Sequence, residues 1–261
     1  MLTVVATTAE LQSLASAVGG DLVSITHLIP AGQDAESFQP RPQDLARLRN
    51  ARAVIRVGVD YDLWLDRLVR EARHVQVIDA SSDVALLDVR AGGIGPGDGH
   101  AHGRGNPHYW LDPANAEMIT ATILEAFIRL EPSNANRFQA NRLAFLSQLD
   151  AKLAHWSRVL HDAPPLIAYH DTWPYFARRF RLRFVGVVEA RPGVPPSPSH
   201  LAGLVQRARQ EKVGFVIREA HEPERDAQFI ASRSGAKVVT LASHGSDYFA
   251  LIDYNVRQLA R

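Results

Sequence analysis

The chain has 261 residues, of which 46% are hydrophobic and 22% are charged, and its formal net charge at pH 7 is +1. This composition is typical of a globular protein and excludes a disordered or fibrous one. The basic residues are mostly Arg and are scattered along the chain, so no basic stripe predicts nucleic-acid binding. Cysteine is absent, which excludes disulfides and thiolate ligands and leaves any metal to His, Asp, Glu and water.

No run of about 18 or more apolar residues is present, so we expect no membrane-spanning helix. No charged and then apolar signal sequence opens the chain, and Leu2 already belongs to an expected strand. A secreted protein without its leader and a cytoplasmic protein would both begin in this way.

Short runs rich in Val and Ile alternate with segments of helical period, a pattern that predicts βαβ units and parallel sheets. In the first half, strands are expected at 2–6, 22–29, 53–58 and 75–78, and helices near 8–18, 42–50 and 61–73. In the second half, strands are expected at 165–169, 184–188, 214–218 and 237–241, and helices near 172–180, 199–211, 223–234 and 246–260. Two α/β lobes are therefore expected.

Residues 133–160 form the most helix-like stretch of the chain. Apolar residues recur there at spacings of three and four, at Leu146, Leu149, Leu153, Trp156 and Leu160. A helix of this length would be roughly 40 Å long, enough to run the height of both lobes. We expect an N-terminal lobe at 1–132 and a C-terminal lobe at 161–261, joined by this stiff helix and moving little about their cleft.

Four side chains at or just after expected strand ends could bind a metal, because ligands bind at that edge of open parallel sheets. Glu36 lies in a proline-punctuated segment, 30–42, and His108 lies in Asn106-Pro107-His108-Tyr109-Trp110-Leu111-Asp112-Pro113. His170 closes a strand and opens a helix, and Asp247 begins the last helix. Glycine-rich residues 88–105 add His100 and His102, either as a plain solvent loop or as an auxiliary metal-capturing loop.

These segments, in this order and spacing, resemble the ZnuA and TroA-like receptors, periplasmic binding proteins that serve ABC importers of zinc, manganese or iron. The resemblance covers essentially the whole chain. Besides segment 30–42, it rests on three motifs: His-x-Trp-Leu-Asp-Pro at 108–113, His-Asp-x-x-x-Tyr-Phe at 170–176, and Gly-x-Asp-Tyr-x-x-x-Ile-x-x-Asn at 245–255.

The resemblance implies two lobes linked by one long helix, with a single metal ion in the cleft and two ligands from each lobe. It implies His108 and His170 as imidazole ligands and Asp247 as a carboxylate ligand. This chain has Glu36 where the family usually has His, and a carboxylate can also bind zinc.

Two points about this site stay open. Either Glu36 binds the metal, or it faces solvent and a water, His221 or His244 completes the site. Glu219 either orients His170 or another ligand through a hydrogen bond, or is a surface or salt-bridged residue.

The resemblance implies a periplasmic or extracytoplasmic receptor, expected to be a monomer without enzymatic activity, that hands one divalent metal ion to an ABC permease. The extra carboxylate favours Mn²⁺ or Fe²⁺, whereas the intrinsic affinity order and the His-bearing loop favour Zn²⁺, so we expect zinc first and manganese next. The alternatives are a metal-dependent hydrolase with an open coordination position and Glu219 or Asp171 as base, or a receptor for an organic solute.

Overall fold

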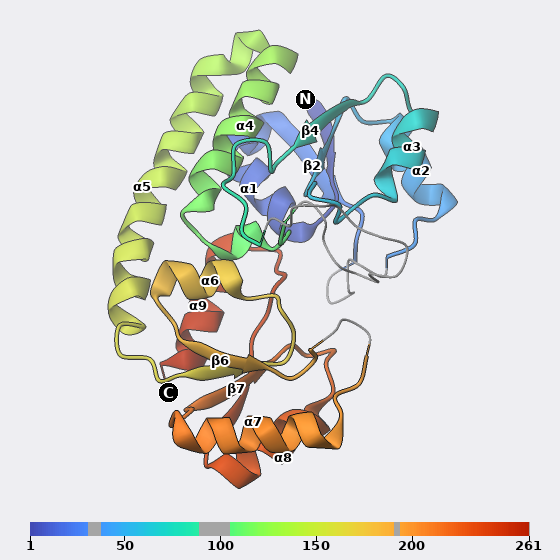
Figure 1. Ribbon diagram of the computed structural model, residues 1–261. Helices are drawn as coiled ribbons and strands as arrows, with labels where there is room; N and C mark the ends of the chain where they lie inside the picture. Colours follow the sequence, from blue (N-terminus) through green and yellow to red (C-terminus); the bar gives the residue numbers. More distant parts are fainter. Residues whose placement is uncertain (31–37, 89–104, 191–193, 261) are drawn as a thin grey trace.

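The computed structural model describes residues 1–30, 38–88, 105–190 and 194–260. It shows two α/β lobes, one above the other, along a long helix that runs down one side of the molecule (Figure 1). The predicted fold class is thereby confirmed. Glu36, His100 and His102 lie outside the described residues.

The first lobe is built on a parallel sheet whose strands lie in the order β2-β1-β3-β4. The strands are β1 (Leu2–Ala6), β2 (Val23–His27), β3 (Ala53–Arg56) and β4 (Gln76–Asp79). The helices are α1 (Ala9–Gly19), α2 (Pro42–Arg49), α3 (Leu65–Glu71) and α4 (Asn115–Leu130). Helices α1 and α4 cover the face of the sheet toward the long helix, and α2 and α3 cover the other face (Figure 1).

The second lobe repeats this arrangement with the strand order β6-β5-β7-β8, again all parallel. Its strands are β5 (Leu166–Ala168), β6 (Phe184–Val187), β7 (Phe215–Arg218) and β8 (Lys237–Thr240). Its helices are α6 (Pro174–Phe180), α7 (Pro198–Gln210), α8 (Glu224–Ser234) and α9 (Tyr248–Leu259). Helices α6 and α9 lie toward the first lobe, and α7 and α8 lie on the opposite side (Figure 1).

The long helix, α5 (Ala135–Val159), has 25 residues and contacts α1 and α4 in the first lobe and α9 in the second. Helix α4, which precedes it, is absent from the helices that the sequence predicted. Its buried Ala116, Ile119, Ile123 and Phe127 nevertheless recur at spacings of three and four. None of the helices in the described ranges is long and apolar enough to cross a membrane.

A hydrophobic core runs through both lobes without a break, from Leu2 in β1 to Leu259 in α9. A charged contact reinforces it: Asp112 of the first lobe, fully buried, accepts hydrogen bonds from Nε and Nη2 of Arg179 in α6, at 2.5 and 3.1 Å. Separating the lobes would expose this apolar surface and break this ion pair. We therefore expect little movement between the lobes.

Candidate metal centre

His108 lies in a buried segment of the first lobe, immediately before the short 3-10 helix η2 (Tyr109–Leu111), and is 5% exposed. Oδ1 of Asn106 is 3.0 Å from both the backbone N and the ring Nδ1 of His108. The amide group of Asn106 donates on its other side to the carbonyl oxygen of Asp171, at 2.9 Å, so its Oδ1 faces the imidazole. An amide oxygen only accepts, so Nδ1 of His108 carries the proton and Nε2 presents the lone pair that a metal needs.

The same asparagine connects the lobes. Asn106 belongs to the first lobe, and Asp171, whose carbonyl it contacts, directly follows His170 in the second. In addition, the hydroxyl of Tyr175 in α6 donates to the carbonyl oxygen of Asn106, at 2.8 Å. These bonds bring the segments of His108 and His170 together at the lobe interface.

His170 follows strand β5 and is oriented by a carboxylate from the neighbouring strand. Its Nδ1 is 2.7 Å from Oε2 of Glu189, two residues beyond the end of β6, and both side chains are 20% exposed. A carboxylate that accepts from one imidazole nitrogen fixes the ring and makes the other nitrogen a better metal ligand. Nε2 of His170 is thus the nitrogen suited to coordination.

Glu219 is 6% exposed, so it is not the surface residue that was one alternative, and among the described residues its carboxylate contacts two hydroxyl groups and not His170. Its Oε1 accepts from Oγ1 of Thr172, at 3.0 Å, and its Oε2 accepts from Oγ of Ser243. Glu189 therefore fills the orienting role expected of Glu219. The sequence did contain a signal for Glu189: it lies just after a predicted strand, at the same edge of the sheet as His170.

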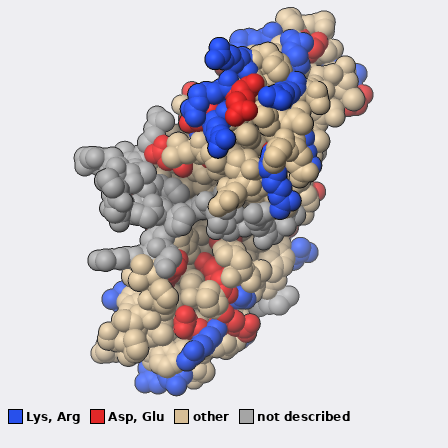
Figure 2. Space-filling view, turned by 90° about the vertical axis from the view of Figure 1, so that its right-hand side faces the viewer, with Lys and Arg blue, Asp and Glu red and all other residues tan. Residues whose placement is uncertain are grey.

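Carboxylates concentrate around this part of the second lobe. The backbone N of Glu219 donates to Oε2 of Glu222, at 2.5 Å. Burial raises the pKa of Glu222 to about 8; this hydrogen bond opposes the rise, and the charges of the Glu219 and Glu189 side chains add to it. Figure 2 shows acidic side chains on the lower lobe just below the grey residues; Lys and Arg are densest on the upper lobe and also lie toward the bottom of the lower one. A carboxyl group with this pKa is mostly protonated at neutral pH, so Glu222 adds little charge. The carboxylate of Glu189, in contact with Nδ1 of His170, is what favours a cation here.

Asp247 is exposed and is the N-cap residue of α9, where its Oδ1 accepts from the backbone N of Ala250, at 2.9 Å. Glu36 lies outside the described residues. Within the described ranges, no three His, Asp or Glu side chains are grouped closely enough to hold one metal ion. The four-ligand set of Glu36, His108, His170 and Asp247 therefore stays a prediction.

The two histidines considered as replacements for Glu36 occupy different environments. His221 is exposed. His244 is at the lobe interface, where its Nδ1 is 3.1 Å from Oε1 of Glu10 and its Nε2 is 3.2 Å from the hydroxyl of Tyr61. Both nitrogens of His244 are thus engaged by protein groups.

Comparison with known proteins places this architecture in one family. A profile of the family described as zinc-uptake complex component A, periplasmic, matches residues 4–261. The chain belongs to this family, whose members are metal-binding receptors of ABC importers and not enzymes. This confirms the predicted resemblance and excludes the hydrolase alternative.

Relatives differ in the metal that they are named for. The manganese ABC transporter substrate-binding lipoprotein PsaA of Streptococcus pneumoniae is 24% identical over 99% of this chain and 88% of its own length. The iron-binding protein YfeA of Yersinia pestis is 22% identical over 90% of this chain and 74% of its own length.

Two solved structures share both the fold and about a quarter of the sequence. A crystal structure of ZnuA has a TM-score of 0.89 and 26% identity, and the match covers 99% of this chain and 98% of that one. FpvC of Pseudomonas aeruginosa in complex with Mn²⁺ has a TM-score of 0.83 and 26% identity, covering 100% and 98%.

Proposed function

We propose that this chain captures one divalent transition-metal ion between its lobes and delivers it to an ABC permease. The observation that carries the proposal is that His108 and His170 are oriented in the same way, each through a side-chain oxygen at its Nδ1. Asn106 binds Nδ1 of His108 and Glu189 binds Nδ1 of His170, so each imidazole presents Nε2 as a ligand.

Asp247 and Glu36 complete the proposed ligand set. Asp247 uses Oδ1 to cap α9, and its other carboxylate oxygen serves the metal. Glu36 supplies the fourth donor in place of the family's usual His, in a set of two nitrogens and two oxygens. We propose zinc as the preferred cargo, because the intrinsic affinity order of divalent metals favours zinc over manganese. Manganese comes next, because the added carboxylate favours manganese or ferrous iron.

The proposed setting follows from the relatives, several of which are named as substrate-binding lipoproteins of metal ABC transporters. We propose that this chain acts as a monomer in the periplasm or at an extracytoplasmic surface. Capture weakens as pH falls, because protonated imidazoles cannot bind the metal.

The test is elemental analysis of protein purified without chelator, followed by competition between zinc and manganese. We expect one equivalent of metal, and loss of high-affinity binding in His170→Ala, Asp247→Ala and Glu36→Gln. The matched control is His161→Ala, because His161 is exposed and pairs with the adjacent Asp162. A parent chain that stays free of metal, or ligand variants that bind as well as the parent, would overturn the proposal.

A further inference from the structure

A strained turn follows strand β3 in the first lobe. Three consecutive residues have positive φ angles: 76° at Gly58, 53° at Val59 and 63° at Asp60. Glycine adopts such angles readily, but a β-branched residue such as Val59 rarely does. Backbone strain of this kind persists where the surroundings impose it, and it clusters at functional sites.

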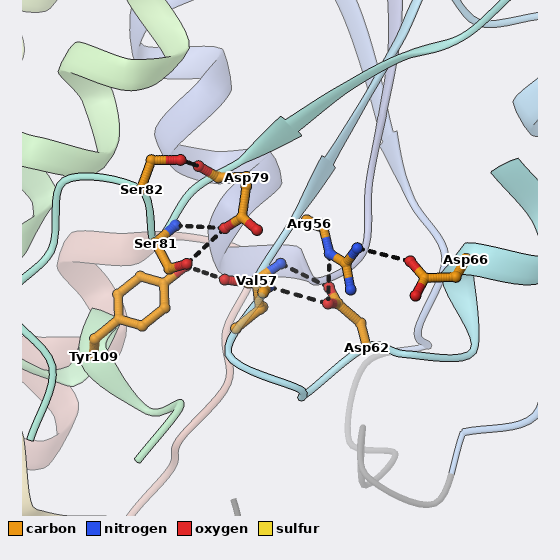
Figure 3. Close-up of polar contacts among 9 residues, drawn as sticks. Arg56, Val57, Asp62, Asp66, Asp79, Ser81, Ser82 and Tyr109 are labelled. Atoms are coloured by element: carbon orange, nitrogen blue, oxygen red, sulfur yellow. Dashed lines mark hydrogen bonds and ion pairs between the residues drawn. The ribbon is translucent and has the colours of Figure 1, made fainter. Parts of the chain in front are cut away.

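The carboxylate of Asp62 imposes the conformation (Figure 3). It accepts from the backbone N of Val57 at 2.7 Å and of Gly58 at 3.0 Å, and Nε of Arg56 lies 3.3 Å away. The hydroxyl of Tyr109, next to His108 in the chain, donates to the carbonyl oxygen of Val57, at 2.7 Å. The turn is therefore tied to the segment that carries His108.

The residue that directly follows this turn is Tyr61, whose side chain is buried, at 5% exposure, and lies against His108. Its ring meets the imidazole of His108 edge-on, with centroids 5.8 Å apart, and the indole of Trp110 at 5.5 Å. The indole also packs on His108, at 5.4 Å. Tyr61 and Trp110 thus flank the imidazole and restrict its rotation.

The hydroxyl of Tyr61 is held in turn by the second lobe. It is 3.2 Å from Nε2 of His244, whose Nδ1 is 3.1 Å from Oε1 of the fully buried Glu10. A carboxylate accepts from Nδ1, so Nε2 of a neutral His244 accepts from the phenol. Glu10 lies in the first turn of α1, where the helix dipole favours a negative charge.

We propose that Tyr61 is a positioning residue for His108, held by the Glu10–His244 pair. A loop of the second lobe then sets the orientation of a metal ligand in the first. This inference rests on the proposed function, since it needs His108 to bind metal. It goes beyond that function by assigning roles to Glu10, Tyr61 and His244.

The test compares Tyr61→Phe, which removes the hydroxyl, with Tyr61→Leu, which also removes the ring. The matched control is Tyr254→Phe, because that hydroxyl makes a comparable bond, 3.0 Å to the carbonyl oxygen of Thr240, on α9. We expect zinc affinity to fall about 3- to 10-fold in Tyr61→Phe and roughly 10- to 100-fold in Tyr61→Leu. The control should bind like the parent.

Two further measurements separate positioning from general destabilisation. The visible spectrum of the Co²⁺-loaded chain should change in both Tyr61 variants and stay unchanged in the control, since it reports ligand geometry. In the background of His244→Phe, Tyr61→Phe should have almost no further effect on zinc affinity, because the bond is already lost.

The outcomes separate the positioning role of Tyr61 from the proposed capture of metal. A parent that binds zinc, together with Tyr61 variants that match Tyr254→Phe in affinity and spectrum, would overturn the positioning role alone. Fully additive effects of Tyr61→Phe and His244→Phe would overturn the part assigned to His244. A parent that binds neither zinc nor manganese would overturn the proposed function and this inference with it.

Discussion

Nδ1 of His170 lies 2.7 Å from Oε2 of Glu189, so a carboxylate beyond one strand orients an imidazole beyond the adjacent strand. This pairing predicts a graded loss of metal affinity. Glu189→Gln keeps an acceptor for Nδ1 but removes the negative charge, whereas Glu189→Ala removes both. We expect zinc affinity to fall about 10-fold in the first and closer to 100-fold in the second, measured by chelator competition.

The control for this pair is Glu211→Gln, which removes an exposed carboxylate that pairs with Arg183. It should leave zinc affinity unchanged. Equal binding by Glu189→Ala and the parent would show that Glu189 does not support the metal site.

Asn106 combines two roles that substitution can separate. Asn106→Asp keeps an acceptor for Nδ1 of His108 but loses the donor to the carbonyl oxygen of Asp171. We expect it to lose about 1–3 kcal/mol of unfolding free energy while zinc binding is retained. Asn106→Ala should lose both, as measured by urea unfolding and zinc titration of the same samples.

Asn141→Ala is the comparison for Asn106, because its amide donates from α5 to the carbonyl oxygen of Val18 in α1, a bond that does not join the two lobes. It should cost some stability and leave zinc binding intact. If Asn106→Asp were as stable as the parent, the cross-lobe bond would contribute nothing.

The parallel sheets could be predicted from the sequence because buried parallel strands are continuous apolar runs, as in Leu166–Ala168 and the first three residues of β7, 215–217. Helix α4 was missed although its apolar spacing was present. The sequence predicts a helix over 61–73, but α3 begins at Leu65, because residues 61–64 form a turn in which the carboxylate of Asp62 accepts from the backbone N of Val57 and Gly58. Such a turn follows from the contacts of Asp62 and not from local propensity.

The candidate site was predictable only in part. His108, His170 and Asp247 lie in recognisable motifs, whereas their supports are distant in sequence. The bond from Tyr61 to His244 joins residues 183 positions apart, and that from His170 to Glu189 depends on the packing of β5 beside β6. Strand order and lobe docking create these pairs, and no local pattern encodes either.

The interlobe ion pair of Asp112 and Arg179 makes a stability prediction. Asp112 is fully buried and the side chain of Arg179 is 37% exposed. Arg179→Ala should cost about 2 kcal/mol of unfolding free energy, less than the loss of a fully buried pair, because water partly screens this one and Nη2 of Arg178 stays 3.5 Å from Oδ2 of Asp112. Arg183→Ala, which breaks the exposed pair with Glu211, should cost no more than about 0.5 kcal/mol in the same denaturant titration. Equal costs would contradict the assigned role of burial.

Glu222 makes the metal-free chain sensitive to pH. Burial raises its pKa from 4.5 to about 8, so the folded chain binds this proton more tightly than the unfolded chain. The free energy of unfolding therefore falls as pH rises from about 4.5 to about 8 and stays reduced above that. Glu222→Gln should raise the melting temperature at pH 9 and have little effect at pH 5. The control is Glu224→Gln, on an exposed residue at the start of α8, which should change the melting temperature by the same small amount at both pH values. If the two variants changed the melting temperature in parallel, the prediction would be refuted.

Gly58 and Gly203 predict opposite effects of the same substitution. A Cβ at Gly58 would lie 2.3 Å from Oδ1 of Asp79, at a φ of +76°, whereas a Cβ at Gly203, inside α7, meets no atom within 4 Å. Gly58→Ala should cost about 1–3 kcal/mol, and Gly203→Ala should add about 0.5–1 kcal/mol, because alanine is the better helix former. Since the turn at Gly58 presents Tyr61 to His108, Gly58→Ala should also weaken zinc binding, and Gly203→Ala should not. Urea unfolding measures the change in stability of both variants, and zinc competition measures the change in affinity. If Gly58→Ala were destabilised but kept the zinc affinity of the parent, the turn would have no role in zinc binding.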